Sequence, residues 1–355
     1  MAYWAKVAAF TTAIAIAVAV PGLAVAVPAD HGLGDVAGIG KLAEVRDRGA
    51  VWRGSSGIAE LGTDRPVPVG GSFRAGSVTK TFVATVVLQL VGERRMRLED
   101  SVERWLPGVV PNGENITVRQ LLNHTSGLYD FVRTIPFPPG QAFFDNRWRT
   151  WTAPEMIAQA LANPPMFEPG PQYSYSNTNY LLLGEVIEKV TGHTYATEIR
   201  RRLIRPLRLT GTTLPGTSPY IPGPHPHGYV PSEHGLVDLT EWNPSVLGAA
   251  GELISTTHDL NAFFAALLGG RLLKPRLLAE MKQPGTKDGH YGLGLSWNET
   301  SCGRVYGNDG DALAYQAYAF ATEDTRHQVT VAVTPDFQTD PDASVKAFIE
   351  KAICS

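Results

Sequence analysis

The segment from Phe73 to Leu90 constrains this chain most, because it places a serine and a lysine together at the start of a long apolar run. It reads F-R-A-G-S-V-T-K-T-F-V-A-T-V-V-L-Q-L, with Ser77 and Lys80 as the polar pair. Residues at i and i+3 of a helix lie on the same face, so the Lys80 amine can approach the Ser77 hydroxyl. Apolar residues continue nearly all round this segment, which predicts a buried helix over residues 77–92. The fold must therefore bury a helix that carries both groups at its N-terminus.

This pair is typical of a nucleophilic serine whose base is a lysine. A serine at a helix N-terminus lies beside unpaired backbone N–H groups and the positive end of the helix dipole. An adjacent amine can then take the hydroxyl proton. The alternative interpretation is an N-cap serine followed by a solvated lysine, and S-x-x-K by itself does not distinguish the two.

A second polar cluster, Tyr175-Ser176-Asn177, stands before another apolar stretch far downstream. One residue separates Tyr175 from Asn177, so a short turn can direct both side chains into one cleft. The phenol can relay protons to and from a serine, and the amide can hold a substrate carbonyl and fix the lysine. The alternative is an aromatic packing residue beside an asparagine that caps the next helix. The joint presence of Ser77 and Lys80 favours the catalytic interpretation.

With these motifs in this order, the chain resembles the penicillin-recognising serine hydrolases, which include serine β-lactamases and penicillin-binding proteins. It is most similar to the secreted D-alanyl-D-alanine carboxypeptidases and class C β-lactamases. The similarity extends through I-T-V-R-Q-L-L-N-H-T-S-G-L-Y-D, E-P-G-P-Q-Y-S-Y-S-N-T-N-Y, H-Y-G-L-G-L and V-Y-G-N-D-G. The resemblance implies an acyl-enzyme at Ser77, a proton relay through Lys80 and Tyr175, and a substrate contact at Asn177. It implies neither a cofactor nor a metal.

The third family motif, Lys/His-Thr/Ser-Gly, is where the chain departs from the pattern, because Asn308, Asp309 and Gly310 occupy it. Asn308 can donate a hydrogen bond but cannot carry a charge. Asp309 places a negative charge where the family holds a substrate carboxylate, and Asp311 adds a second one nearby. Gly310 still allows a substrate backbone to approach the strand. By family position, the backbone amides of Ser77 and Asp311 form the oxyanion hole.

Three functions remain open on this evidence. The carboxypeptidases tend to carry an arginine near the position of Ser296 here, and Arg304 is the substitute if its side chain reaches the cleft. The first function, which the resemblance favours, is a carboxypeptidase that acts on peptides ending in D-Ala-D-Ala and is acylated by penicillins. The second is the same chemistry on a D-amino-acid amide, an ester or a β-lactam. The third is a weakly active homologue that binds peptidoglycan.

The order of elements predicts an α/β lobe with an inserted helical lobe. We expect a β-lactamase/transpeptidase-like fold, an antiparallel sheet flanked by helices, with the motifs between the two lobes. Residues 30–97 and 246–355 are assigned to the α/β lobe and residues 98–245 to the helical lobe. Within the first lobe, a hairpin is predicted around Asp47-Arg48-Gly49. A later helix is predicted over 252–268, and strands over 292–297, 304–306, 313–321 and 327–334.

The first 29 residues have the pattern of an export signal. Lys6 precedes an alanine-rich apolar run that ends in the small residues of A-V-A-V-P-A-D. An uncleaved anchor is the alternative, because the run approaches the length that spans a bilayer. We expect a signal peptide over residues 1–29, a secreted protein, and no stable association with the membrane once the signal is removed.

Export also bears on the two cysteines, Cys302 and Cys354. An oxidising compartment favours a disulfide between them, and the secreted carboxypeptidases that the chain resembles carry one in this arrangement. Two unpaired cysteines are the alternative.

Other partners find little support in the sequence. The net charge is −3 and no basic cluster is interleaved with aromatic residues, which argues against a nucleic-acid partner. His225 and His227, with His234 further along, could ligate a metal, but the surrounding prolines indicate a surface loop. His124 is interpreted as a last-turn residue of a helix that ends at Gly127, its C′ glycine. We expect a monomer that acts on a peptide or β-lactam substrate.

Overall fold

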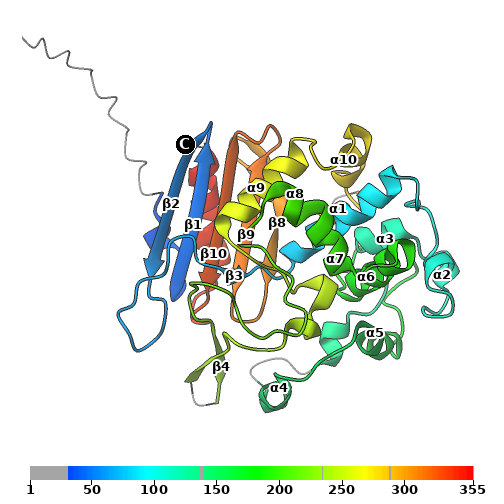
Figure 1. Cartoon of the computed structure of the whole chain (residues 1–355), viewed down its shortest axis with the longest axis horizontal. Coiled ribbons are helices and arrows are strands. Elements are labelled where there is room, and N and C mark those ends of the chain that lie inside the picture. Colours follow the sequence, from blue (N-terminus) through cyan, green and yellow to red (C-terminus); the bar gives the residue numbers. More distant parts are fainter. Residues whose placement is uncertain (1–30, 136–139, 234, 288, 355) are drawn as a thin grey trace, which may run out of the picture.

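The computed structural model describes residues 31–135, 140–233, 235–287 and 289–354. The expected signal peptide (residues 1–29) and His234 lie outside these ranges. Six strands form one antiparallel sheet in the order β2-β1-β10-β9-β8-β7 (Figure 1). They are β1 (Gly40–Asp47), β2 (Ala50–Gly57), β7 (Ser296–Thr300), β8 (Gly303–Asp311), β9 (Gln316–Thr322) and β10 (His327–Thr334). The two ends of the chain therefore build a single sheet, because β1 pairs with β10 along its whole length.

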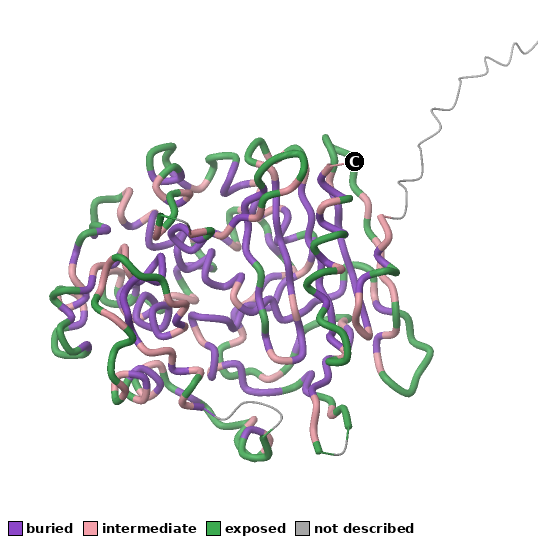
Figure 2. Tube along the Cα trace, turned by 180° about the vertical axis from the view of Figure 1, so that it is seen from behind, coloured by how far each residue is buried: buried purple, intermediate pink, exposed green. Residues whose placement is uncertain are grey.

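Helices cover both faces of this sheet. The last helix, α11 (Asp342–Cys354), packs on one face, where Phe348 and Ile349 join Val329 and Val331 of β10 in a common apolar cluster. The opposite face contacts α1 (Val78–Gly92) and α9 (Thr257–Leu268). In Figure 2 the trace is buried through most of the sheet and the central helices and exposed mainly in the outer loops. The predicted antiparallel sheet flanked by helices is confirmed.

The remaining helices lie mainly between β2 and β7 in the sequence. They are α2 (Val102–Trp105), α3 (Val118–Leu122), α4 (Gln141–Asn146), α5 (Ala153–Leu161), α6 (Thr178–Thr191), α7 (Tyr195–Ile199), α8 (Arg205–Leu207) and α10 (Pro275–Met281). Two short ribbons pair β3 (Phe73–Arg74) with β6 (Ile254–Ser255), and β4 (Tyr229–Ser232) with β5 (Gly235–Asp238). Most of these helices lie to one side of the sheet in Figure 1. The assignment of residues 98–245 to a separate lobe stays a prediction.

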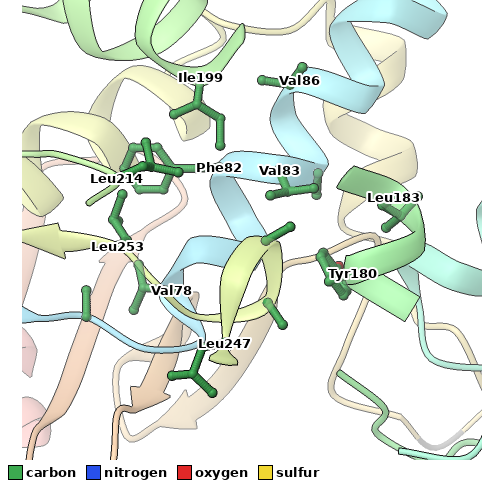
Figure 3. Packing of buried hydrophobic residues seen from close by; sticks show 14 of the residues in the cluster. Val78, Phe82, Val83, Val86, Tyr180, Leu183, Ile199, Leu214, Leu247 and Leu253 are labelled. Atoms are coloured by element: carbon green, nitrogen blue, oxygen red, sulfur yellow. The ribbon is translucent and has the colours of Figure 1, made fainter. Parts of the chain in front are cut away.

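Helix α1 is buried on nearly every side, as its apolar composition predicted. Phe82 stacks on Phe263 of α9 with ring centroids 3.7 Å apart. Figure 3 shows Val83 and Tyr180 in the same core, where α1 approaches α6. Because interiors are packed at near-crystalline density, this environment fixes the helix axis and the residue at its N-terminus. That residue is Ser77.

Several predicted boundaries differ from the structure, and the strand predicted over 313–321 spans Gln316–Thr322. The helix predicted from residue 252 begins at Thr257, because Ile254 and Ser255 pair with β3 and the Thr256 side chain caps the helix. The strand predicted over 292–297 begins at Ser296, since Gly294 has a φ of 73° and interrupts an extended conformation. The strand predicted over 304–306 extends further, to Asp311. This extension carries the third motif on β8.

Candidate active site

Ser77 and Lys80 meet at the N-terminus of α1, as the i, i+3 spacing predicted. The Lys80 ammonium nitrogen Nζ lies 3.0 Å from Ser77 Oγ, 2.8 Å from Asn177 Oδ1 and 2.7 Å from the Ala250 carbonyl oxygen. Lys80 is fully buried, and the Ser77 side chain makes no capping hydrogen bond. The alternative of a capping serine with a solvated lysine is therefore excluded.

Tyr175 and Asn177 come from the turn that precedes α6. Tyr175 Oη donates to Ser77 Oγ at 2.7 Å. Asn177 occupies the N-cap position of α6, but its side chain makes no capping hydrogen bond. The side chain instead lies between Lys80 and the carboxylate of Asp130. The side chains of Tyr175 and Asn177 thus reach the Ser77 hydroxyl and the Lys80 amine from a distant part of the sequence.

Burial sets the protonation of the two groups that contact Ser77. Desolvation lowers the pKa of Lys80 to about 7, while the negative charges of Asp130 and Asp309 oppose this shift. Burial raises the pKa of Tyr175 well above its usual value, and the neighbouring Tyr291 adds to the increase. At neutral pH the amine is therefore available as a base, whereas the phenol keeps its proton and acts as a donor.

The end of β8 forms an open sheet edge beside Ser77. Strand β7 pairs with β8 only as far as Gly307, so residues 308–311 have no strand partner on that side among the residues that the structure describes. A Cβ atom added to Gly310 would lie 2.7 Å from the Ser77 nitrogen, and one added to Gly76 would lie 2.8 Å from the Asp311 nitrogen. Only glycines permit this approach. The backbone of β8 at Gly310 and Asp311 therefore lies directly against the backbone at Gly76 and Ser77. The two amides predicted to form the oxyanion hole belong to this contact.

The side chains of the third motif point in different directions. Asn308 is only 3% exposed and donates from Nδ2 to Thr81 Oγ1 at 3.1 Å, so it faces α1. Asp309 reaches solvent, and within the described residues it forms no ion pair. The surrounding protein removes enough water to raise the pKa of Asp309, as does Asp342, whereas Lys80 opposes the increase. Asp309 is therefore close enough for its charge to raise the pKa of Lys80.

The second carboxylate of this strand, Asp311, also reaches solvent. Desolvation raises its pKa, and a hydrogen bond from the Leu313 amide to Asp311 Oδ1 (2.8 Å) opposes this. Asp309 and Asp311 therefore stand at alternate positions of β8, and both are exposed.

Arg304 does not supply the family's missing arginine. Its guanidinium binds Glu299 (Nε to Oε1, 2.7 Å) and lies over the ring of Trp297, towards the far end of the β7–β8 hairpin. Ser296 Oγ donates to the Gly307 carbonyl oxygen at 3.1 Å. Neither side chain brings a positive charge to the open edge of β8.

The same hairpin is joined to the end of α11 by the predicted disulfide. Cys302 and Cys354 are bonded, with Cα atoms 5.5 Å apart. The pairing expected from the resemblance is confirmed, and the alternative of two free thiols is excluded.

His124 packs inside the protein next to Tyr175, but the prediction that its helix ends at Gly127 is wrong. Helix α3 ends at Leu122, and His124 itself has a φ of 60°, which makes it the left-handed residue after the helix. Gly127 has another role, since a Cβ atom there would lie 2.0 Å from the Phe167 carbonyl oxygen. The buried His124 ring packs 4.3 Å from that of Tyr175 and thereby holds the phenol in position.

The other histidine pair does not form a metal site in the described part of the chain. His225 Nδ1 lies 2.7 Å from the Gly223 carbonyl oxygen, and His227 Nδ1 lies 2.6 Å from Asp238 Oδ2. Among the described residues, no three metal-ligating side chains come together. The same residues contain no helix that is long and apolar enough to cross a bilayer.

Sequence reasoning missed three groups of the site: Asp130, Tyr291 and the Ala250 carbonyl. Asp130 stands at the end of the H-T-S-G-L-Y-D segment, but nothing in its spacing relates it to Asn177. A backbone carbonyl has no sequence signature at all.

The family model described as Beta-lactamase matches residues 12–352. The chain belongs to the Beta-lactamase family. Among solved structures, this Beta-lactamase-family protein is similar to a D-stereospecific amidohydrolase from a Streptomyces species (39% identity, TM-score 0.82, 91% of this chain and 96% of that one). It is also similar to the D-amino acid amidase of Ochrobactrum anthropi SV3 (28%, TM-score 0.78, 91% and 94%). The predicted family and fold are confirmed.

Curated relatives are more distant or shorter matches. Penicillin-binding protein 4* of Bacillus subtilis is 32% identical over 61% of this chain and 49% of its own length. The D-aminopeptidase of Brucella anthropi is 27% identical over 81% of this chain and 54% of its own length. The Beta-lactamase-family chain thus spans about half the length of these curated relatives.

Proposed function

We propose that this protein is a serine amidohydrolase that cleaves the amide bond following a D-amino acid whose α-amino group is free. The observation that carries the proposal is the position of Asp309, on the open edge of β8 and within electrostatic range of Lys80. A partly desolvated carboxylate without an ion-pair partner gains free energy when an ammonium group approaches it. The same carboxylate repels the free C-terminus that a carboxypeptidase must hold.

The proposal is also supported by the two side chains considered for holding a substrate carboxylate, because neither brings a positive charge to the open edge of β8. Arg304 is bound to Glu299, and Ser296 is neutral. Solved structures with high similarity over nearly the whole chain are named as a D-stereospecific amidohydrolase and a D-amino acid amidase. The first name specifies hydrolysis of amides with D stereochemistry, and the second names D-amino acids.

The chemistry follows from the hydrogen bonds to Ser77. Neutral Lys80 takes the Ser77 proton while the Ser77 oxygen forms a bond to the substrate carbonyl carbon. The oxyanion that develops is held by the amides of Ser77 and Asp311. Tyr175 gives its proton to the leaving nitrogen as the C–N bond breaks, and Lys80 returns a proton to the phenolate. Water then hydrolyses the ester at Ser77 by the reverse sequence of proton transfers.

Hydrolysis of peptides ending in D-Ala-D-Ala, which the sequence favoured, is the competing proposal. Its support is the similarity to Penicillin-binding protein 4*. It requires that Asp309 tolerate a carboxylate, and it predicts that penicillins acylate Ser77. Secretion also remains a prediction, because the signal segment lies outside the described residues.

The decisive experiment compares three substrates: D-phenylalanine amide, its N-acetyl derivative and an N-acylated peptide ending in D-Ala-D-Ala. We expect hydrolysis of the free amine to be fastest and Asp309→Asn to raise its KM about tenfold, as for the loss of one charge-assisted hydrogen bond. On the pH plateau above the Lys80 pKa, the N-acetyl amide should be unaffected by this substitution. Asp324→Asn, at an exposed carboxylate paired with Arg326, is the matched control.

Two results would contradict the proposal. Equal losses on the free and the acetylated amide would give Asp309 a structural role. Preferential cleavage of the D-Ala-D-Ala peptide by the wild-type protein would favour the carboxypeptidase instead.

A further inference from the structure

Asp130 is the one carboxylate in direct contact with the Asn177 amide within the described residues. The Asn177 backbone nitrogen lies 3.1 Å from Asp130 Oδ1, and Asn177 Nδ2 lies 3.3 Å from Oδ1 and 3.0 Å from Oδ2. Asp130 Oδ1 also caps the short helical turn over Phe131–Thr134 by accepting from the Val132 nitrogen. Asp130 does not touch Ser77, so it can act only through Asn177 or through its charge.

The first consequence concerns which way the Asn177 amide faces. The Nδ2 group donates to Asp130, so Oδ1 must face Lys80, where it accepts from Nζ at 2.8 Å. Rotation of the amide by half a turn would bring Oδ1 against a carboxylate and Nδ2 against an amine, and both contacts are unfavourable. The carboxylate therefore selects one of the two orientations.

This orientation decides what the lysine can do. A neutral amine has two hydrogens and one lone pair. Asn177 Oδ1 and the Ala250 carbonyl oxygen are acceptors only, so they take the two hydrogens. The lone pair is then left for the third neighbour, Ser77 Oγ, at 3.0 Å. A reversed Asn177 amide would compete with the serine for that lone pair.

The second consequence concerns charge. The titratable groups around the lysine and its phenol partner are His124, Asp130, Tyr173, Tyr175, Tyr180, Tyr291 and Asp309. Burial raises the pKa of the four tyrosines and lowers that of the histidine, so these five side chains are neutral near pH 7. The negative charge that favours protonated Lys80 comes from Asp130 first and Asp309 second.

We propose that Asp130 is a positioning residue for the lysine base: through the Asn177 amide it directs the Lys80 lone pair at Ser77, and through its charge it sets the pH at which that lone pair becomes available. This inference rests on the proposed serine chemistry but not on a D-amino-acid substrate. An ester that carries no amine, such as p-nitrophenyl acetate, can therefore test it separately.

The experiment measures kcat/KM for p-nitrophenyl acetate against pH, at the isosbestic wavelength of p-nitrophenol. Asp130→Asn keeps an oxygen for the Val132 cap and for Asn177, but it removes the charge. We expect the acidic limb of the profile to move to lower pH by about 1 unit, because an opposite charge nearby raises a lysine pKa by that order. Asp130→Glu retains the charge and should restore the wild-type limb.

Asp130→Ala removes the orientation of the amide as well as the charge. We expect its plateau rate to fall at least tenfold below that of Asp130→Asn, because the Asn177 amide can then reverse. Asp100→Asn is the matched control, since Asp100 is a buried carboxylate that accepts from the Arg97 nitrogen at 2.8 Å but does not contact the site. Its profile should keep the wild-type limb.

An acidic limb that stays in place in Asp130→Asn would overturn the inference and leave Asp130 as a structural cap. Intact-mass detection of the acetyl adduct on Ser77 verifies that the rates report this serine. If the wild-type protein acylates with the ester but does not cleave D-amino-acid amides, the proposed substrate fails while the role of Asp130 stands. If no adduct forms on Ser77, both proposals are refuted.

Discussion

The proposed proton relay through Lys80 and Tyr175 makes a quantitative prediction for a double-mutant cycle. Lys80→Met keeps the buried alkyl chain and removes the amine, and Tyr175→Phe removes the hydroxyl that lies 2.7 Å from Ser77 Oγ. A general base or acid contributes about 10²–10⁴ to the rate, which corresponds to about 2.7–5.5 kcal/mol of transition-state stabilisation. We expect each single variant to lose acylation rate by a factor in this range.

The double variant carries the stronger test. Both groups contact the same serine oxygen. In the proposed mechanism a proton passes from one to the other, so removal of either one breaks the relay. The double variant should therefore be at most about tenfold slower than the slower single variant, since residues that act as a unit are non-additive. The assay is single-turnover cleavage of D-phenylalanine amide, whose leaving nitrogen must take up a proton, with the adduct on Ser77 verified by intact mass.

Tyr180→Phe is the matched control for the lost hydroxyl. Tyr180 is fully buried, and its ring lies 5.5 Å from Lys80 Nζ, but its hydroxyl donates to the Leu122 carbonyl oxygen. Its loss should slow acylation less than tenfold. Full additivity of the Lys80 and Tyr175 losses, for instance two factors of 10³ giving 10⁶, would refute a common relay and assign the two residues to separate steps.

Two other substitutions test the disulfide and the third motif. Replacing both Cys302 and Cys354 by serine opens a bridge with a sequence separation of 52 residues, and the loop-closure estimate gives a loss of about 4 kcal/mol in unfolding free energy; an unchanged urea midpoint would contradict this. Asn308→His combined with Asp309→Thr should improve kcat/KM for a peptide ending in D-Ala-D-Ala about tenfold to a hundredfold, because an unfavourable charge near a carboxylate costs about 1–3 kcal/mol. The C-terminally amidated peptide should gain little, and equal gains on both peptides would show that Asn308 limits the chemistry instead.

The features predicted correctly from the sequence are those that local geometry determines. The contact between Ser77 and Lys80 follows from helical spacing once the apolar run identifies a helix. The hairpin around Arg48 follows from two strand patterns and a glycine at the turn, and the structure pairs Asp47 with Ala50 there. In both cases the residues that interact lie within one element or in two adjacent ones.

The features that were missed depend on long-range register. Asp130 reaches Asn177 across 47 residues, and no periodic pattern reports that distance. The strand that carries Asn308 is predicted only as far as Tyr306, and the residues that follow include asparagine, aspartate and glycine, which are typical of turns. Pairing with β9 keeps those residues extended as far as Asp311. Tertiary pairing therefore outweighs local propensity at the position where specificity is expected to reside.

The arrangement also explains why a change in substrate charge need not require a new catalytic apparatus. Ser77 and Lys80 belong to the N-terminal end of α1, and Tyr175 belongs to the turn before α6, whereas Asp309 lies on the edge of β8. The charge of the third motif can therefore change from positive to negative while every hydrogen bond to Ser77 and Lys80 stays in place.

This separation is geometric but not electrostatic. The charge of Asp309 raises the pKa of Lys80, in opposition to burial. A neutral residue at position 309 therefore lowers the pKa of the lysine and moves the acidic limb of the rate profile to lower pH, in addition to any effect on the substrate. Below pH 7 this gain in free base would add to the measured rate of an Asp309 variant on every substrate. Substrate preferences should consequently be compared on the plateau above the lysine pKa. There, a change in rate for the substrate with a free amine alone reports a change in substrate binding. A change in rate shared by all substrates reports a change in the lysine base.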